Sequence, residues 1–388
     1  MNPRRLLILG IAAVVALAVA VLLANRTNES TPATDALLYP DLKAQADSVT
    51  AIRIFKAGDA RAIEVKRNGA EWTLSERNGY PIAAAKARNL VRALSNAKVL
   101  EEKTSDASKY SSLSVEDVSD AGAKGVRIEL EGPATPVNLI VGKDAPGGKS
   151  SYVRRVGEPK SWLVSEQLSA SPEPRDWLDK DIMNVSADRI QSAEISIEGQ
   201  KPYTASKSSR ADAAFKVEPL PKGKQLSSAN AADDVATGLL SLSLDDVQPK
   251  ADIASGKTNA QATYKTFDGL VVELAGFKKD DKHYVTIKTS YDAALADKFK
   301  VKTADDAKAA DNTKPNAADG AAKAADDANA KAADASKGEG PAPAATPPAP
   351  DVAAEAEKTN AKVGNWAYEI SSYKYDSIFR PLDGMLKK

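Results

Sequence analysis

Polar and apolar residues alternate along many short stretches of this chain, a pattern typical of strands with one buried face. The first such stretch, Val49–Ile54, is followed by a second at Ala62–Arg67 and a third at Trp72–Leu74. Between the second and the third stands Asn68-Gly69, a dipeptide typical of a two-residue hairpin turn. A helix is predicted next, because apolar residues recur at helical spacing at Leu90, Val91, Leu94 and Ala97.

The same order of parts recurs about 140 residues later, with a strand at Ile190–Ile197, a hairpin at Tyr203–Val217 and a helix carrying Val235, Leu239, Leu240 and Leu242. Four strands follow each helix, at 126–130, 137–142, 152–156 and 162–164 in the first copy and at 262–267, 270–276, 284–287 and 366–370 in the second. We therefore predict an α+β fold made of two tandem similar units. Each unit is expected to be an antiparallel sheet with one packed helix and one face in water.

The N-terminal segment departs from this alternation. Leu6–Ala24 is an uncharged run of 19 residues, preceded by Arg4 and Arg5 and followed by Arg26. A helix of that length reaches about 28 Å, close to the hydrocarbon thickness of a bilayer. The paired arginines predict a single-pass anchor in the bacterial inner membrane, with a cytoplasmic N-terminus and a periplasmic or extracytoplasmic body. A cleaved signal peptide is the alternative, because Ala18-Val19-Ala20 has the small-x-small pattern of a cleavage site.

Changes in composition divide the chain into predicted parts. Residues 1–26 form the anchor and 27–36 a polar tether, while 37–180 and 181–388 are the two units. Residues 302–360, built mainly of Ala, Asp, Lys and Pro, are predicted to be a disordered insertion in the second unit, because they carry scarcely any large apolar residue. The insertion falls in a hairpin connection, so its two ends are expected to lie close together.

Charge and cysteine content exclude several classes of function. The 53 basic and 53 acidic residues balance, so no overall field favours nucleic acid, and we predict no nucleic-acid partner. Without cysteine, the chain has no disulfide, no thiolate metal site and no cysteine nucleophile. Neither a cofactor nor a bound metal is predicted.

Three features resemble functional motifs but lack the spacing or context that those motifs require. Gly142–Ser150 is glycine-rich, yet its spacing is not that of a phosphate loop and a strand follows it, so a hairpin loop is predicted. His283, the only histidine, is expected to be a solvent-facing residue at a strand edge. Asp176, Asp179 and Asp181 surround Trp177, and we interpret them as a charged connector with that tryptophan as a packing residue.

The remaining candidates are acidic pairs and aromatic residues. Three acidic pairs are made of sequence neighbours: Glu116-Asp117, Asp245-Asp246 and Asp280-Asp281. Neighbouring side chains on a strand point to opposite faces, so the two acids of a pair would not face the same site. We assign these pairs to turns or helix ends. Apolar residues recur at roughly helical spacing in the C-terminal stretch Tyr373–Leu386, which is expected to cap the second unit. Core packing is predicted for three tryptophans, Trp72, Trp162 and Trp366. A carbohydrate-stacking platform made of these rings remains an alternative. No catalytic, cofactor-binding or metal-binding residue is predicted.

The chain resembles the DUF4340 family of bacterial membrane-anchored proteins. The resemblance rests on the N-terminal anchor, Trp72 in a third strand, Gly142-Lys143 followed by Tyr152-Val153, the Arg175-Asp176 connector and the repeated unit. Members are often encoded beside a gliding-motility-type ABC transporter, and the family brings no catalytic residues. The resemblance therefore implies an accessory role at a membrane complex.

We accordingly predict a non-catalytic, extracytoplasmic accessory or scaffold protein with an integral membrane partner such as an ABC transporter subunit. One alternative is an envelope glycan- or lipid-binding module. Another is a hydrolase that uses acidic residues alone.

Overall fold

The computed structural model describes residues 35–300 and 351–387. Contacts within the chain divide these residues into two compact units. The first contains residues 35–181 together with Leu244–Pro249, and the second contains Ile182–Ser243, 250–300 and 351–387. The predicted membrane anchor 1–26 and most of the tether lie outside the described residues. Among the described residues, none of the helices combines the length and the apolar content that a membrane span requires.

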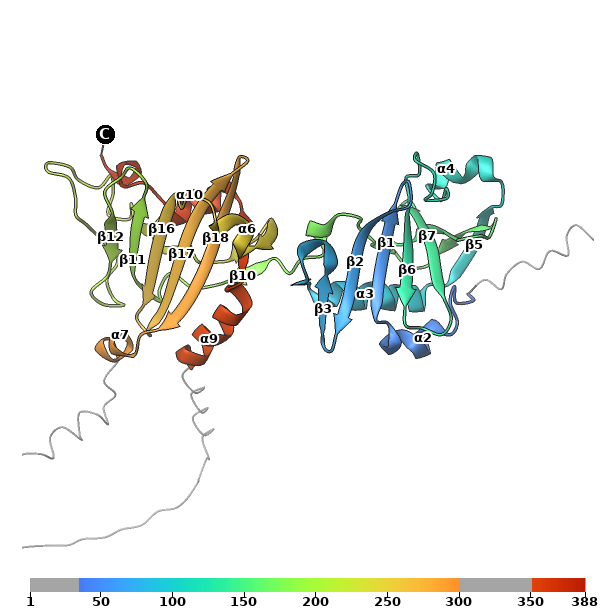
Figure 1. Ribbon diagram of the computed structural model, residues 1–388, viewed down its shortest axis with the longest axis horizontal. Coiled ribbons are helices and arrows are strands. Elements are labelled where there is room, and N and C mark those ends of the chain that lie inside the picture. The colour runs from blue at the N-terminus through green and yellow to red at the C-terminus, as the bar shows by residue number, and fades with distance from the viewer. Residues whose placement is uncertain (1–34, 301–350, 388) are drawn as a thin grey trace, which may run out of the picture. The chain divides into compact units, whose positions relative to one another are not determined.

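The first unit is built on a nine-stranded sheet in which all strand pairs are antiparallel. Its order is β4-β3-β2-β1-β6-β7-β8-β9-β5 (Figure 1). The predicted hairpin is present, since Asn68 pairs with Glu71 and Gly69 takes a φ of 63°. The strands are β1 (Ala51–Lys56), β2 (Ala60–Asn68), β3 (Glu71–Leu74), β4 (Tyr80–Pro81), β5 (Val99–Thr104), β6 (Val126–Glu131), β7 (Val137–Asp144), β8 (Ser151–Arg155) and β9 (Ser161–Val164).

One long helix, α3 (Ala84–Asn96), supplies the main core of this unit. Ala87, Leu90, Val91 and Leu94 recur on one face of the helix and are all buried. Ala97, predicted as the last helical position, is instead the extended C-cap residue, although it is buried. The short helices of this unit are α2 (Leu42–Gln45), η1 (Ala46–Ser48), η2 (Ser75–Arg77), η3 (Ala107–Lys109), α4 (Tyr110–Leu113) and η4 (Pro174–Asp176).

A smaller core covers part of the opposite face of the first sheet. It contains Tyr110, Val115, Val118 and Ile140. Gly142 on β7 allows this covering segment to approach, because a Cβ at that position would lie 2.1 Å from the carbonyl oxygen of Leu113. The sheet is therefore covered on both faces in this region, and the expectation of one fully wet face is too simple.

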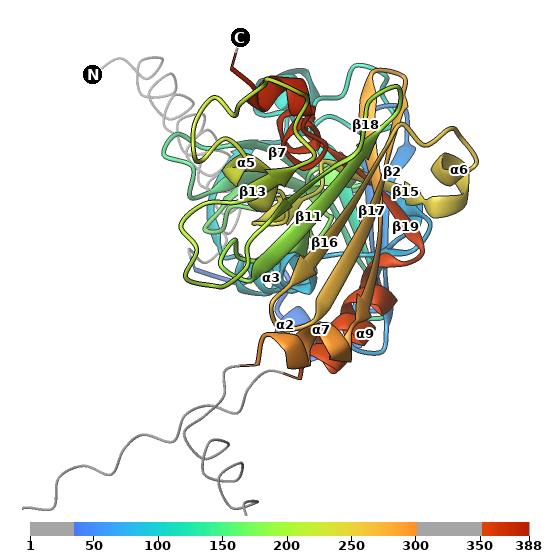
Figure 2. The ribbon, with the colours of Figure 1, turned by 90° about the vertical axis from the view of Figure 1, so that its left-hand side faces the viewer.

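The strands of the second unit lie in the order β13-β12-β11-β16-β17-β18-β19 (Figure 2). The predicted strands are present, with bounds shifted by a few residues. They are β11 (Ile190–Ile197), β12 (Tyr203–Ser206), β13 (Lys216–Glu218), β16 (Ala260–Thr266), β17 (Leu270–Lys279), β18 (Lys282–Tyr291) and β19 (Trp366–Ile370). Shorter elements are β10 (Asp181–Met183), β14 (Leu242–Ser243), α6 (Lys250–Ala254) and α7 (Ala293–Lys298), whereas β15 (Asp246–Pro249) belongs to the first unit.

The helix predicted over Val235–Leu242 is largely wrong. Only α5 (Asp233–Ala236) is helical, and Leu242 belongs to β14. The chain leaves the helix at Gly238, where a Cβ would lie 2.6 Å from the hydroxyl of Tyr264, and Ser241 adopts a φ of 49°. The apolar spacing was correct for burial of Val235 and Leu239, but tight packing ends the helix after one turn.

The disorder predicted for 302–360 is wrong at its C-terminal end. Residues 301–350 lie outside the described residues, whereas α9 (Val352–Val363) is an ordered helix that buries Val352, Ala356 and Val363. Asp351 caps its start by accepting a hydrogen bond from the Ala354 amide, 3.1 Å away. Low apolar content hid this helix, because small alanines suffice where a helix packs closely on a sheet.

Both ends that flank residues 301–350 lie at the same end of the second sheet, where α7 and α9 are seen together (Figures 1 and 2). The ring of Phe299, just after α7, is 5.0 Å from that of Phe267. At the start of α9, Glu355 binds Arg189, which also binds Asp268. The chain therefore leaves and returns at neighbouring places on either side of residues 301–350, although the predicted C-terminal end of the insertion, Asn360, lies near the other end of α9.

The C-terminal stretch forms two helical pieces, α10 (Ser372–Ile378) and η5 (Leu382–Met385), separated at Pro381. Its apolar face is buried in the second unit, with Tyr375, Ile378 and Met385 at most 3% exposed. The expected capping of this unit is therefore present, in two pieces instead of one helix.

Candidate functional site

The glycine-rich loop Gly142–Ser150 is a hairpin connection, as predicted. It joins β7 to β8, whose residues Asp144 and Ser151 are paired. The Ala145 amide donates to the Ser150 carbonyl at 2.8 Å, and Gly147 and Gly148 take positive φ angles. The loop leads from strand to strand, so no helix N-terminus supplies the amide groups that a phosphate loop needs.

His283 is not at a strand edge. It lies within β18 and is paired with Lys278 of β17 on one side and with Ile370 of β19 on the other. Its ring is half-buried and lies 4.8 Å from the ring of Tyr375. The ring therefore packs against the C-terminal helix, which the alternation pattern could not reveal.

Two of the acidic pairs contribute a carboxylate to a structural ion pair. Asp117 accepts a hydrogen bond from Arg154 at 2.6 Å, and this arginine is itself 3% exposed. Asp246 accepts two from Arg77, at 2.5 and 2.8 Å. Burial alone would raise the pKa of Asp246, but the bonds from Arg77 and from the Val247 amide lower it.

The third pair, Asp280-Asp281, forms the turn between β17 and β18. Both residues take positive φ angles, 51° and 60°, which are typical of a tight hairpin turn.

The connector around Trp177 is packed as predicted. Trp177 is 3% exposed, and its indole N–H donates to the Ser171 carbonyl at 2.9 Å. Asp176 accepts from the Ser171 hydroxyl at 2.6 Å. Across the described residues, no group of three or more His, Asp or Glu side chains is placed to hold a metal ion.

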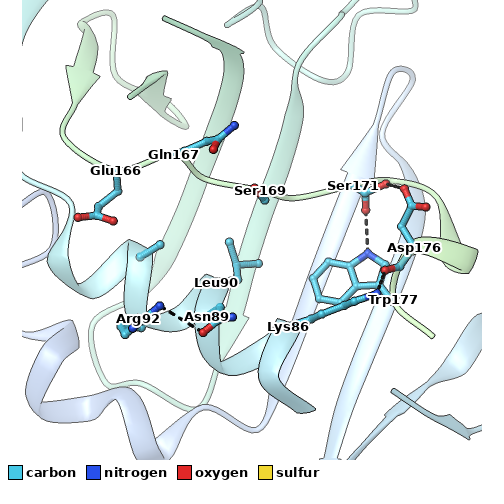
Figure 3. A pocket seen from close by; sticks show the side chains of 11 residues that line it. Lys86, Asn89, Leu90, Arg92, Glu166, Gln167, Ser169, Ser171, Asp176 and Trp177 are labelled. Atoms are coloured by element: carbon cyan, nitrogen blue, oxygen red, sulfur yellow. Dashed lines mark hydrogen bonds between the residues drawn. The ribbon is translucent and has the colours of Figure 1, made fainter. Parts of the chain in front are cut away.

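A cavity of about 470 Å³ separates α3 from the segment that precedes this connector. Figure 3 shows Lys86, Asn89 and Leu90 on the helix beneath the segment that carries Gln167 and Ser171. Trp177 closes one end. The cavity therefore has one polar helical wall and one wall of extended chain.

Two cationic side chains of this first cavity are hydrogen-bonded within the fold. Lys86 donates to the carbonyls of Asp176 and Leu178, and Arg92 donates to Asn89 at 3.3 Å. Burial lowers the pKa of Lys86, and the nearby charge of Lys180 lowers it further. Since its ammonium group holds the connector against α3, we interpret this cavity as a structural seam.

A second cavity, of about 520 Å³, lies on the other flank of α3. Four cationic side chains line it, Lys43, Arg67, Arg88 and Arg92, and they come from α2, β2 and α3. Apolar wall is provided by Trp72, Val91, Ala46 and Ala70, and Asp47 is the one carboxylate among its lining residues. The cavity thus combines an apolar surface with an excess of positive charge.

The arginines that line the second cavity differ from most other arginines of the first unit in their ion pairing. Six others form ion pairs with carboxylates: Arg53, Arg61, Arg77, Arg127, Arg154 and Arg155. Within the described part of the chain, no carboxylate pairs with Arg67, Arg88 or Arg92. Arg67 donates instead to the carbonyls of Gly69 and Asp47, at 3.1 and 2.8 Å.

The family assignment follows from comparison with known families. The family described as "Domain of unknown function (DUF4340)" matches residues 72–266, about half of the 388 residues. This chain belongs to the DUF4340 family. A search of curated proteins and of solved structures finds no match.

The DUF4340 match begins at Trp72 and therefore includes all of α3, with Arg88 and Arg92. Lys43 and Arg67 lie before it. The second cavity is consequently assembled from residues on both sides of the match boundary.

Sequence reasoning missed this cavity. A signal was present, since the charged residues of α3 are Lys86, Arg88 and Arg92, all positive. The sequence could not predict that Arg67 and Lys43 line the same cavity, because only the folded sheet brings β2 and α2 beside the helix.

Proposed function

We propose that this DUF4340 protein is a non-catalytic accessory or scaffold subunit of an ABC-type transporter complex in the bacterial inner membrane. A single N-terminal span holds it, the N-terminus is cytoplasmic, and the body is extracytoplasmic. The observation that carries the proposal is family membership, because the resemblance to DUF4340 is what links the chain to a transporter.

We further propose that the body arose by tandem duplication of one unit. The series β3-β2-β1-β6-β7-β8-β9 and β13-β12-β11-β16-β17-β18-β19 follow the chain in the same order. Trp162 on β9 and Trp366 on β19 occupy the corresponding strand of each series. Both series bury an apolar face, so each can act as a rigid module that presents its edges and loops to a partner.

A binding role, in place of catalysis, is supported by the state of the candidate residues. Asp117 and Asp246 pair with arginines, and Asp280 and Asp281 form a turn. Lys86 is occupied by two carbonyls. Each of these groups has a structural role that accounts for its position in the fold.

Affinity purification of the full chain from detergent-solubilised membranes tests the proposal. Mass spectrometry is expected to find an ABC-type permease or ATPase subunit in the eluate. A matched control replaces residues 1–26 with an unrelated single-span helix, so that co-purification through the body is separated from co-purification through the anchor. Recovery with no transporter subunit, in conditions that keep known complexes intact, would overturn the proposal.

The alternative, an envelope glycan- or lipid-binding module, divides into two cases. A glycan platform needs exposed rings, but Trp72 and Trp162 are at most 8% exposed, and of the three candidate tryptophans Trp366 alone is partly exposed. The cationic cavity beside α3 favours the case of an anionic ligand with an apolar part.

A further inference from the structure

The cavity beside α3 has the composition of a ligand site. Its volume of about 520 Å³ lies in the range of small-molecule pockets. Trp72 and Val91 form part of an apolar wall, and four cations stand against one carboxylate, Asp47. A site of this kind is complementary to an anion that carries an apolar group.

The charge of α3 is unfavourable for the helix itself. Arg88 and Arg92 stand four residues apart, where like charges repel. The first turn contains no acidic residue, and Lys86 lies near the N-terminus, where the helix dipole disfavours a cation. An external anion bound beside the helix would relieve this repulsion. A helix with a purely structural role gains no stability from such a cluster of like charges.

The third arginine approaches from the sheet. Two backbone carbonyls, of Gly69 and Asp47, hold the guanidinium of Arg67 in place at 3.1 and 2.8 Å. A guanidinium carries more N–H groups than these two bonds use, so Arg67 retains donors for a ligand. Guanidinium groups match phosphate oxygens in geometry, and Arg is the preferred residue for such sites.

We propose that this cavity binds a phosphate ester, with the phosphate on Arg67, Arg88 and Arg92 and the apolar part of the ester against Trp72 and Val91. The proposal does not depend on the transporter association, so either can fail alone. The same chemistry is offered by a phospholipid headgroup and by a soluble phosphate ester.

Phenyl phosphate is the probe, titrated by calorimetry into the full chain held in micelles of dodecyl maltoside, a detergent without phosphate. It is expected to bind, and inorganic phosphate and phenol are each expected to bind at least about tenfold more weakly, since each lacks one half of the ligand. Equal binding of inorganic phosphate would overturn the apolar part of the proposal, and equal binding of phenol the anionic part.

The double variant Arg88→Gln/Arg92→Gln tests the residues. We expect its affinity for phenyl phosphate to fall at least about tenfold, because charge-assisted hydrogen bonds are lost. Glutamine is a good helix former and the variant relieves repulsion, so thermal unfolding should be unchanged or shifted upward. Unchanged affinity in this variant would overturn the proposal.

Arg175→Gln is the matched control. Arg175 is exposed, lies in the same unit and outside the cavity, and has no ion pair among the described residues. Its substitution should change affinity by less than about twofold, since distant surface charges are screened. A loss equal to that of the double variant would show that only net charge matters, which overturns the site.

Competition then identifies the source of the phosphate. If dihexanoyl phosphatidylglycerol displaces phenyl phosphate more effectively than glycerol 3-phosphate does, the site takes a lipid headgroup. The reverse order supports a soluble phosphate ester. Failure of both to compete would overturn the proposed class of ligand.

Discussion

Glu64, on β2, is a buried carboxylate held by three cations. It is 4% exposed and lies 3.0 Å from Arg53, 3.1 Å from Lys66 and 3.4 Å from Arg61. Ser75 donates a further hydrogen bond at 3.1 Å. Burial alone would raise the pKa of Glu64, but these hydrogen bonds and charges lower it to about 2.

This lowered pKa predicts a pH-dependent contribution to stability. The contribution is complete above the usual carboxyl pKa of about 4.5, and it is lost as the pH falls from there toward 2, because the folded state must then accept a proton. We expect Glu64→Gln to lower the free energy of unfolding by on the order of 2 kcal/mol at pH 7, and by progressively less toward pH 2. Urea unfolding of both proteins between pH 2 and 7 measures this difference.

The control for this prediction is Glu71→Gln. Glu71 is exposed on β3 and has no ion pair among the described residues, so its substitution should change stability by less than about 0.5 kcal/mol at every pH. A difference between the native protein and Glu64→Gln that stays constant across this pH range would contradict the assigned role of the carboxylate.

Single residues were predictable where local chemistry decides their conformation. Asn68-Gly69 specifies its turn by backbone preference alone, and the Asp280-Asp281 turn was likewise placed correctly. The role of Glu64 was not predictable, because its three cations come from β1 and β2 in a register that the sequence leaves open. Arg61 and Lys66 lie on the same strand as Glu64, but Arg53 reaches it only through the pairing of β1 with β2.

At the scale of elements, Arg189 connects the start of α9 to the turn between β16 and β17. Its guanidinium donates to both carboxylate oxygens of Glu355, at 3.0 and 2.9 Å, and to Asp268 at 2.9 Å. All three side chains are at most one-third exposed. This fork attaches the start of α9, just after residues 301–350, to the second sheet.

We predict that Arg189→Ala destabilises the second unit. Removing a partly buried bidentate partner leaves two carboxylates close together, so the free energy of unfolding should fall by on the order of 2 kcal/mol. Hydrogen exchange is expected to increase in α9 before it does in β17. Urea unfolding and amide exchange on the full chain measure the two effects.

Lys288→Ala is the comparison for this variant. Lys288 pairs with Glu273 at 3.4 Å, and both side chains are at least half exposed. Such a surface pair contributes little, so its loss should cost less than about 0.5 kcal/mol. If both variants lost the same stability, the Arg189 fork would be no more than an ordinary surface contact.

Strands were predictable and helices less so, for a physical reason. Strands such as β16 alternate between buried and more exposed positions, and their pattern survives in the sequence. The one-turn helix α5 carries apolar residues at helical spacing, but Gly238 and Ser241 redirect the chain. Conversely, α9 is built of small residues that pack on β18, so its sequence resembled a disordered segment.

At the scale of the whole molecule, the DUF4340 match runs from β3 in the first unit to β16 in the second. A family match that crosses the boundary between the units indicates that the two occur together as one evolutionary module. The cationic cavity belongs to the first unit and the charged fork of Arg189 to the second. Ligand binding and attachment of the chain around residues 301–350 can therefore be tested by independent substitutions.

The remaining whole-molecule prediction concerns the N-terminal run Leu6–Ala24. If it stays in the bilayer, the full chain should remain with membranes after alkaline carbonate extraction, and its intact mass should include the residues before Ala20. A C-terminal alkaline phosphatase fusion should be active, since the paired Arg4 and Arg5 retain the N-terminus in the cytoplasm. A chain that begins just after Ala20 and is released by carbonate would establish a cleaved signal peptide, while an inactive fusion would place the body in the cytosol. In either of these cases the body could not act as the membrane-anchored extracytoplasmic subunit proposed above.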